Sequence, residues 1–139
     1  MYLLDTNVIS ESRKLGTARI DPGAARWLGE VDAEATFVSA MTVFELERGV
    51  RQMERRDERQ GAALRAWFED RVMATYEHRI LPLSRSVALI CARLHIPDPK
   101  SERDAWIAAT AIEAELTLVS RNVTNFDGMG VSLVNPFAK

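Results

Sequence analysis

Short apolar runs alternate along the chain with longer segments in which apolar residues recur every three or four positions. The short runs predict strands buried on both faces of a sheet. Alternation of such strands with helices indicates βαβ units, a mainly parallel sheet and helices on both of its faces. We therefore expect a three-layer α/β/α sandwich. The predicted strands lie at residues 2–4, 36–38, 80–83, 117–119 and 131–134.

Residues that favour helix starts precede most of the helical segments. Asp21 stands before Pro22, and Ser39, Ser84 and Ser101 occupy positions where a side-chain oxygen can cap the following helix. The expected helices cover residues 8–12, 22–31, 40–57, 62–73, 85–94 and 102–116.

The longest predicted helix has a stripe of apolar residues, Val43, Leu46, Val50 and Met53, that would face the core. Gly61 is expected to end this helix, and a second helix follows after a short connection. A short connection makes helices antiparallel neighbours, so we predict a helical-pair insertion in the sandwich.

Length and composition fit a globular protein, because 139 residues amount to one domain, 1–139, and 47% of them are hydrophobic. The 18 Lys and Arg residues against 20 Asp and Glu residues give a net charge of -2. This overall charge argues mildly against a nucleic-acid partner, although a local basic patch can still contact phosphates.

Cysteine and histidine are scarce, and this restricts the kinds of site. Cys91 is the single cysteine, so no intramolecular disulfide can form, and with no leader ahead of the first strand we expect a cytoplasmic protein. His78 and His95 are the only histidines, which disfavours zinc and favours a hard cation held by oxygen atoms. No apolar run approaches the roughly 20 residues that span a membrane.

Three acidic residues are candidates for chemistry. Asp5 follows a predicted strand, where α/β proteins place ligand-binding groups, although it can equally cap the next helix. Asp104 lies in the first turn of a buried helix, but Ser101 and Asp104 also resemble a capping box. Glu45 and Glu47 flank the apolar stripe on opposite sides, and periodicity does not choose between them.

Four segments together resemble the motifs of PIN-domain ribonucleases, the VapC-type toxins of bacterial toxin–antitoxin pairs, and most closely their FitB-like branch. The segments are YLLDTNVISE at 2–11, SAMTVFEL at 39–46, DAWIAATA at 104–111 and LVSRNVTNF at 118–126, followed by an ending NPF at 135–137. They occur in the family's order and at its spacing over nearly the whole chain. The resemblance implies a PIN-like fold, metal-dependent cleavage of RNA, a cognate antitoxin and a homodimer.

The resemblance also assigns roles to individual residues. It selects Glu45 over Glu47 and implies that Asp5, Glu45 and Asp104 hold Mg²⁺ or Mn²⁺, with Asn122 as a fourth catalytic residue. The residues implied to support the metal or the substrate are Thr6, Asn7, Ser120 and Arg121. Two positions depart from the family pattern: Asn122 stands where an acid is usual, and Ser120 where threonine is usual.

Electrostatics supports a cation at such a cluster independently of the resemblance. Two carboxylates about 4 Å apart repel by roughly 4 kcal/mol at an effective dielectric constant near 20. Three of them take up protons or recruit a cation, and Mg²⁺ and Mn²⁺ suit sites built only from oxygen.

Basic residues offer two possible surfaces for RNA. Arg13, Lys14 and Arg121 lie near the proposed site in the sequence and are candidates for phosphate contacts. The arginine run at residues 48–59 is interleaved with acids, which favours a solvated helix with ion pairs over an RNA-binding surface.

Two other classes of function remain open. The chain could be a PIN-like binding module with impaired catalysis, which the Asn122 departure permits. It could also be a receiver-like or phosphatase-like domain with an aspartate nucleophile, but no lysine stands directly after a predicted strand.

Overall fold

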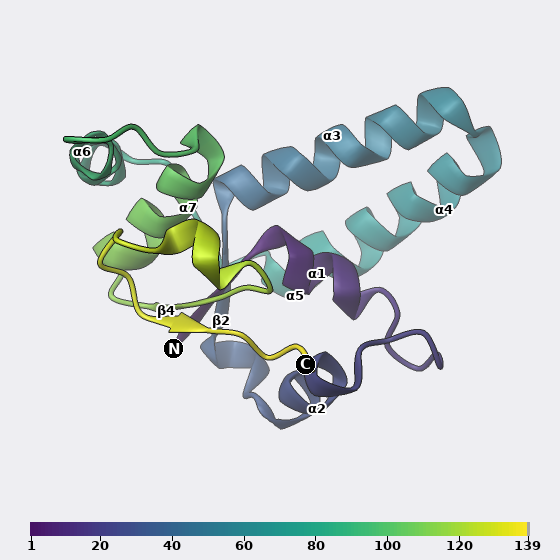
Figure 1. Ribbon diagram of the computed structural model, residues 1–139. Helices are drawn as coiled ribbons and strands as arrows, with labels where there is room; N and C mark the ends of the chain where they lie inside the picture. Colours follow the sequence, from purple (N-terminus) through teal and green to yellow (C-terminus); the bar gives the residue numbers. More distant parts are fainter. Residues whose placement is uncertain (139) are drawn as a thin grey trace.

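Five parallel strands form the centre of the computed structural model, which describes residues 1–138. Their order across the sheet is β3-β2-β1-β4-β5, so the first strand is central and the chain passes to one side of it before crossing to the other (Figure 1). The strands are β1 (Tyr2–Leu4), β2 (Thr36–Ser39), β3 (Ile80–Leu81), β4 (Thr117–Val119) and β5 (Leu133–Val134).

Helices cover both faces of this sheet, as the sequence predicts. They are α1 (Thr6–Ser12), α2 (Pro22–Glu30), α3 (Ala40–Arg56), α4 (Glu58–Trp67), α5 (Ala74–Tyr76), α6 (Arg85–Leu94) and α7 (Glu102–Glu113). A π-helical turn, Phe68–Met73, joins α4 to α5, and short 3-10 turns occupy Ala33–Ala35 and Val123–Phe126. In the described residues, no helix combines the length and the apolar character needed to cross a bilayer.

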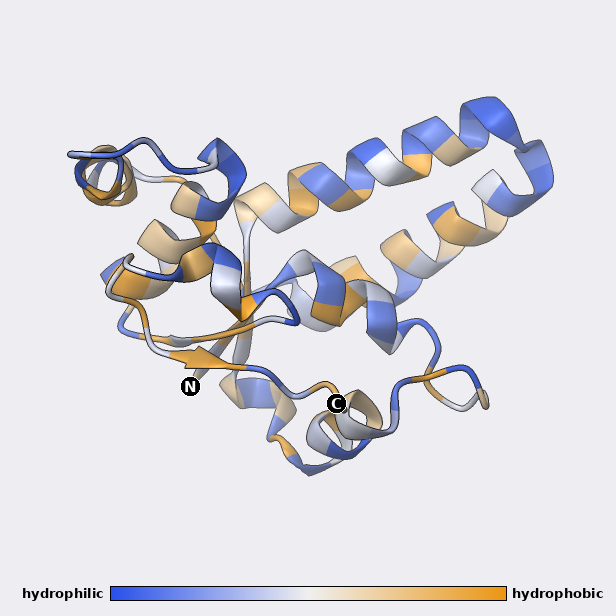
Figure 2. Cartoon of the chain, viewed as in Figure 1, coloured by the Kyte–Doolittle hydropathy of each residue, from blue (hydrophilic) through white to orange (hydrophobic). Residues whose placement is uncertain are grey.

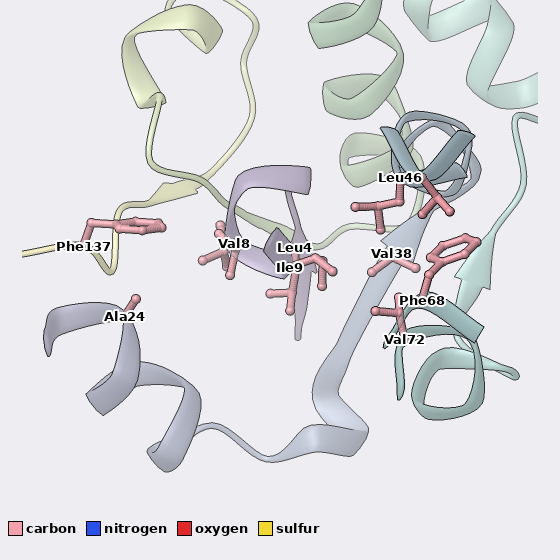
Figure 3. Packing of buried hydrophobic residues seen from close by; sticks show 11 residues of the cluster. Leu4, Val8, Ile9, Ala24, Val38, Leu46, Phe68, Val72 and Phe137 are labelled. Carbon is pink, nitrogen blue, oxygen red and sulfur yellow. The ribbon is translucent and has the colours of Figure 1, made fainter. Parts of the chain in front are cut away.

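Neighbouring residues of the central strand face different cores. Leu4 packs with α1, α3 and the π-helical turn (Figure 3). Leu3 packs with α7 on the other face. Such alternation is the period of two that every strand imposes on its side chains. Because both leucines are essentially inaccessible to solvent, β1 is held on both sides and the residue that follows it has a fixed position.

Helix α7 is buried by the sheet on one side and by α6 on another. Ile107, Ala108 and Ala111 contact the sheet side, while Ala105 and Ala109 pack with Val87 and Cys91 of α6. This explains the nearly continuous apolar sequence of the helix.

The outer strands are shorter than predicted. β3 ends at Leu81 rather than at residue 83, because Pro82 has no N–H to continue the ladder. β5 begins at Leu133 rather than at residue 131, just after Gly128 and Gly130, whose positive φ angles turn the chain.

The helical pair is present, but its turn is not where the sequence predicted. α3 ends at Arg56, and Asp57 caps α4 by accepting a hydrogen bond from the Gln60 N–H at 3.1 Å. Gly61 lies inside α4 and does not end a helix. A Cβ atom there would stand 2.4 Å from Glu54 Cα, so the glycine allows the two helices to approach each other closely.

Helix α7 ends at Glu113 instead of continuing to residue 116. Glu115 takes a left-handed φ of 56°, and the Leu116 N–H donates to the Ala111 carbonyl at 2.8 Å. This is the Schellman arrangement that closes many helices, usually with glycine at the left-handed position. Glu115 gives no such signal in the sequence, which is why the predicted helix was too long.

Candidate active site

Three acidic side chains from distant parts of the chain meet at the carboxyl end of the sheet. Asp5 directly follows β1, Glu45 comes from the second turn of α3, and Asp104 from the first turn of α7. All three bond to the guanidinium group of Arg103, at 2.5 Å for Asp5, 2.6 Å for Glu45 and 2.5 Å for Asp104. The structure thus brings the three predicted acids together around one arginine side chain.

Asp5 both caps a helix and belongs to the cluster. Its Oδ1 accepts from the Thr6 N–H at 2.7 Å, and its Oδ2 accepts from the Ser120 hydroxyl at 2.7 Å. The carboxylate is fully buried. The two interpretations of Asp5 therefore describe one geometry, in which the cap fixes the orientation of the carboxylate.

Asp104 does not form the expected capping box. The Ser101 side chain makes no capping hydrogen bond, and the hydrogen bond that Asp104 accepts comes from Arg103. Asp104 is nevertheless buried, with only 6% of its surface exposed. Such burial is unusual for an aspartate whose only role is to lie at the start of a helix. Its position in the first turn serves the cluster, and the helix dipole favours a negative charge there.

Glu45 and Glu47 point to different surroundings. Glu45 accepts a hydrogen bond from the Thr6 hydroxyl at 2.5 Å in addition to that from Arg103. Glu47 instead bonds to Arg65 and Arg51 on the helical pair, and these arginines lower the pKa of its carboxyl to about 2. Glu45 is thus the acid of α3 that faces the cluster.

Hydrogen bonds from the loop after β4 support Asp5. Ser120 is fully buried, and its hydroxyl also lies 3.3 Å from Asn7 Nδ2 and accepts from the Asn122 N–H at 3.0 Å. The Asn7 side-chain oxygen accepts from the Arg121 N–H at 3.1 Å. Ser120 and Asn7 therefore connect α1 to the loop beneath the cluster.

Asn122 and Arg121 lie at the rim and not in the cluster itself. Both side chains are exposed, and the Arg121 guanidinium stacks on the Phe137 ring at 4.2 Å from its centroid. The Asn122 N–H donates to the Ser120 hydroxyl, and Asn122 lines the same open cleft as Asp104.

Arg103 is the site residue that the sequence analysis missed. Burial by itself lowers the pKa of its guanidinium, but Glu45 and Asp5 raise that pKa above its ordinary value, so the group stays charged. The available signal was its position directly before Asp104, because three clustered acids need a nearby cation. The sequence analysis interpreted residues 101–104 as a capping box and therefore assigned no role to Arg103.

An open cleft of about 540 Å³ meets the cluster at Arg103 and Asp104. Its lining is polar and includes three basic side chains, Lys14, Arg103 and Arg121, together with Thr6, Asn7, Ser10, Glu11, Asp104, Asn122 and Asn125. Arg13 does not line this cleft: its guanidinium lies 5.9 Å from the centroid of the Trp67 ring, and it lines a neighbouring cavity together with Thr6 and Glu45. Acids beside cations in one cleft suit a phosphodiester that is bound through metal and basic groups.

The donor atoms at the cluster fit a hard divalent cation. Asp5, Glu45 and Asp104 offer only carboxylate oxygens, which Mg²⁺ and Mn²⁺ prefer. Within residues 1–138, however, no three acidic, histidine or cysteine side chains stand close enough in this arrangement to share one ion directly. Each of the three carboxylates instead accepts a hydrogen bond from a different nitrogen atom of Arg103.

Comparison with known proteins gives consistent matches. The family model of the PIN domain matches residues 2–129. The toxin FitB of Neisseria gonorrhoeae is 31% identical over 99% of this chain and 99% of its own length, and the VapC ribonuclease Y4jK of Sinorhizobium fredii is 31% identical over 99% and 98%. The crystal structure of FitAcB from Neisseria gonorrhoeae superposes with a TM-score of 0.86 at 31% identity and covers 98% of both chains.

FitB and Y4jK align with this chain over nearly their full length, and the FitAcB structure has the same fold. The resemblance that four short motifs indicated therefore extends to the whole architecture. This chain belongs to the PIN-domain family.

Proposed function

We propose that this chain is an endoribonuclease that hydrolyses RNA phosphodiesters with Mg²⁺ or Mn²⁺. The observation that carries the proposal is the convergence of Asp5, Glu45 and Asp104 at the carboxyl ends of parallel strands, beside a cleft with basic side chains. Acidic clusters at this end of a sheet are suited to ligand chemistry and not to stability, because the acids repel one another.

The roles of the residues follow from their contacts. Asp5, Glu45 and Asp104 would hold the ion, which would neutralise charge on the phosphate and lower the pKa of a water molecule. Ser120 and Thr6 orient Asp5 and Glu45 through hydrogen bonds, as supporting residues of metal sites commonly do. Lys14 and Arg121 would contact RNA phosphates, and Asn122 would hydrogen-bond a water or a phosphate oxygen; the support is that all three residues line the cleft.

We further propose a cellular role as the toxin of a toxin–antitoxin pair, acting in the cytoplasm as a homodimer. The support is the relationship to proteins named as a toxin and as a VapC ribonuclease. The partner would then be a cognate antitoxin that keeps RNA out of the cleft.

The test is cleavage of a labelled RNA by the purified chain with Mn²⁺, Mg²⁺ or excess chelator. Asp5→Asn and Asp104→Asn should reduce cleavage to background while circular dichroism and gel filtration remain those of the folded chain. Glu47→Gln is the matched control, because Glu47 lies on the same helix as Glu45 but bonds to arginines away from the cleft.

Full cleavage in chelator would contradict the metal dependence. A folded wild-type chain that binds RNA but does not cut it under any metal condition would instead favour a binding module.

A further inference from the structure

One guanidinium group is shared by all three acids of the proposed site. Arg103 Nε donates to Glu45, Nη2 donates to Asp5 and Nη1 donates to Asp104, so each nitrogen bonds to a different carboxylate. These acids come from separate elements, and Arg103 is the group that joins them. It is therefore a positive charge in direct contact with all three negative ones.

We propose that Arg103 is an internal counter-ion that competes with the divalent cation for the three carboxylates and moves into the cleft when the cation binds. The inference rests on the proposed function, since it takes the carboxylates to be metal ligands. It adds a residue of this chain that sets how readily the site accepts metal.

Geometry requires one of the two cations to leave the centre of the cluster. Direct ligation brings carboxylate oxygens to about 2.0–2.1 Å from Mg²⁺. With Arg103 in place, no three acidic, histidine or cysteine side chains among residues 1–138 stand close enough to share an ion. A guanidinium and a divalent cation between the same oxygens would also repel each other strongly.

Charge explains why the exchange can proceed. Three carboxylates and one guanidinium leave the cluster with an excess of two negative charges, so a divalent cation is still attracted. The metal-free site is meanwhile protected from the full repulsion of the acids. Arg103 thus holds β1, α3 and α7 together until the cation replaces it.

The open cleft offers space for the displaced Arg103 side chain. Arg103 is 31% exposed and already lines the open cleft with Lys14 and Arg121. Rotation about its side-chain bonds would place the guanidinium in this cleft without a change in the backbone of α7. There it can bind a phosphate through paired hydrogen bonds, a geometry that arginine favours.

Calorimetric titration of the full chain with Mn²⁺ tests the proposal. Arg103→Gln removes the competing charge, so its Kd for Mn²⁺ should fall by about tenfold or more relative to wild type. Arg121→Gln is the matched control, because it removes the same charge from the same cleft without touching the acids, and its Kd should change much less. Asp104→Asn, added to each protein, should abolish the binding and assign it to this site.

Thermal unfolding supplies a second measurement. Without metal, Arg103→Gln should unfold at a lower temperature than wild type, because the carboxylates lose their shared cation. Saturating Mn²⁺ should then raise its midpoint by more than it raises that of wild type, since tighter binding stabilises more.

The outcomes separate the two proposals. Equal Kd values for wild type and Arg103→Gln, with binding that Asp104→Asn abolishes, would overturn the role of Arg103 and leave the metal-dependent function intact. Absence of Asp104-dependent Mn²⁺ binding in every protein would overturn the metal site itself.

If Arg103→Gln does not fold, Arg103→Lys replaces it in the titration. One ammonium cannot bond to three acids as the guanidinium does, so the Kd of Arg103→Lys for Mn²⁺ should be lower than that of wild type. An equal Kd overturns the proposal.

Discussion

At the scale of single residues, hydroxyl groups determine where the acids of the site point. The Thr6 hydroxyl donates to Glu45 at 2.5 Å and lies 3.1 Å from the Thr42 hydroxyl. Apart from Thr6, Glu45 is bonded to Arg103, the group that we expect to move. Thr6 is therefore the contact that keeps Glu45 in place in both states of the site.

We expect Thr6→Val to lower Mn²⁺-dependent cleavage by about 10- to 100-fold, the usual cost of removing a hydrogen bond behind a metal ligand. Thr6→Ser keeps the hydroxyl and should stay near wild type. Thr42→Val is the control, because it removes the other hydrogen bond of the Thr6 hydroxyl and keeps the one between Thr6 and Glu45. Cleavage rates over a range of Mn²⁺ concentrations measure the effect, and equal rates for Thr6→Val and Thr6→Ser would contradict it.

Residue types and positions in the sequence proposed Asp5 and Asp104 as candidates, and the family resemblance completed the predicted cluster. Asp5 could be predicted because the end of a strand is the expected place for a functional acid. Glu45 could be chosen only through the family motif, because the apolar periodicity does not distinguish Glu45 from Glu47. Arg103 was not predicted because its role depends on acids that are distant from it in the sequence. Only the folded chain brings Asp5 and Glu45 to the residue next to Asp104.

At the scale of elements, the pair α3 and α4 shows a limit of local sequence rules. Glycine often ends a helix, and Gly61 was interpreted in that way. Asp57 actually starts the second helix, and Gly61 faces the backbone of the first. Whether a glycine ends a helix or permits close packing depends on what lies opposite it, which is tertiary information. Figure 2 shows hydrophilic residues along this pair, mostly near the connection between its two helices, with hydrophobic residues interspersed.

Gly61→Ala should destabilise the chain by about 1–3 kcal/mol, because the new Cβ would press on the Glu54 backbone, which cannot yield as a flexible side chain does. Gly49→Ala in α3 is the control: its Cβ would meet nothing within 4 Å, so the change should stabilise the helix by about 0.5–1 kcal/mol. Urea unfolding of both variants measures the difference. Equal stability of the two variants would show that the helices are not in close contact at Gly61.

At the scale of the whole molecule, the topology could be predicted because buried strands and helices alternate so regularly. The parallel order places β1 at the centre, and the chain crosses over β1 between β3 and β4, so the segments after β1, β2 and β4 reach the same edge of the sheet. A crossover of this kind is where α/β folds commonly place their sites. The lengths of the outer strands were less predictable, because Pro82 and the glycine turns limit hydrogen bonding that an apolar sequence alone would allow.

The whole molecule is slightly acidic, so RNA binding must depend on local basic surface. Two candidates exist: the cleft with Lys14 and Arg121, and the arginine run of α3 and α4. On the helical pair, Arg51 bonds to Glu47, while Arg65 bonds to Glu47, Glu54 and Glu69. In the cleft, Lys14 bonds to Glu11 at 3.1 Å. The cleft is favoured because Lys14 and Arg121 line it together with Asp104, one of the acids of the proposed site.

The salt dependence of RNA binding distinguishes the two surfaces. For single-stranded RNA, the logarithm of the binding constant falls with the logarithm of salt concentration by about 0.7 for each phosphate that is neutralised. Lys14→Ala and Arg121→Ala should therefore each reduce the slope by about 0.7, measured by fluorescence anisotropy of labelled RNA in chelator to prevent cleavage. Arg55→Ala, an exposed arginine of α3 away from the cleft, should leave the slope unchanged. A reduced slope for Arg55→Ala together with unchanged slopes for both cleft variants would show that RNA binds to the helical pair and not in the cleft. The proposed position of the phosphodiester beside the acids would then be contradicted.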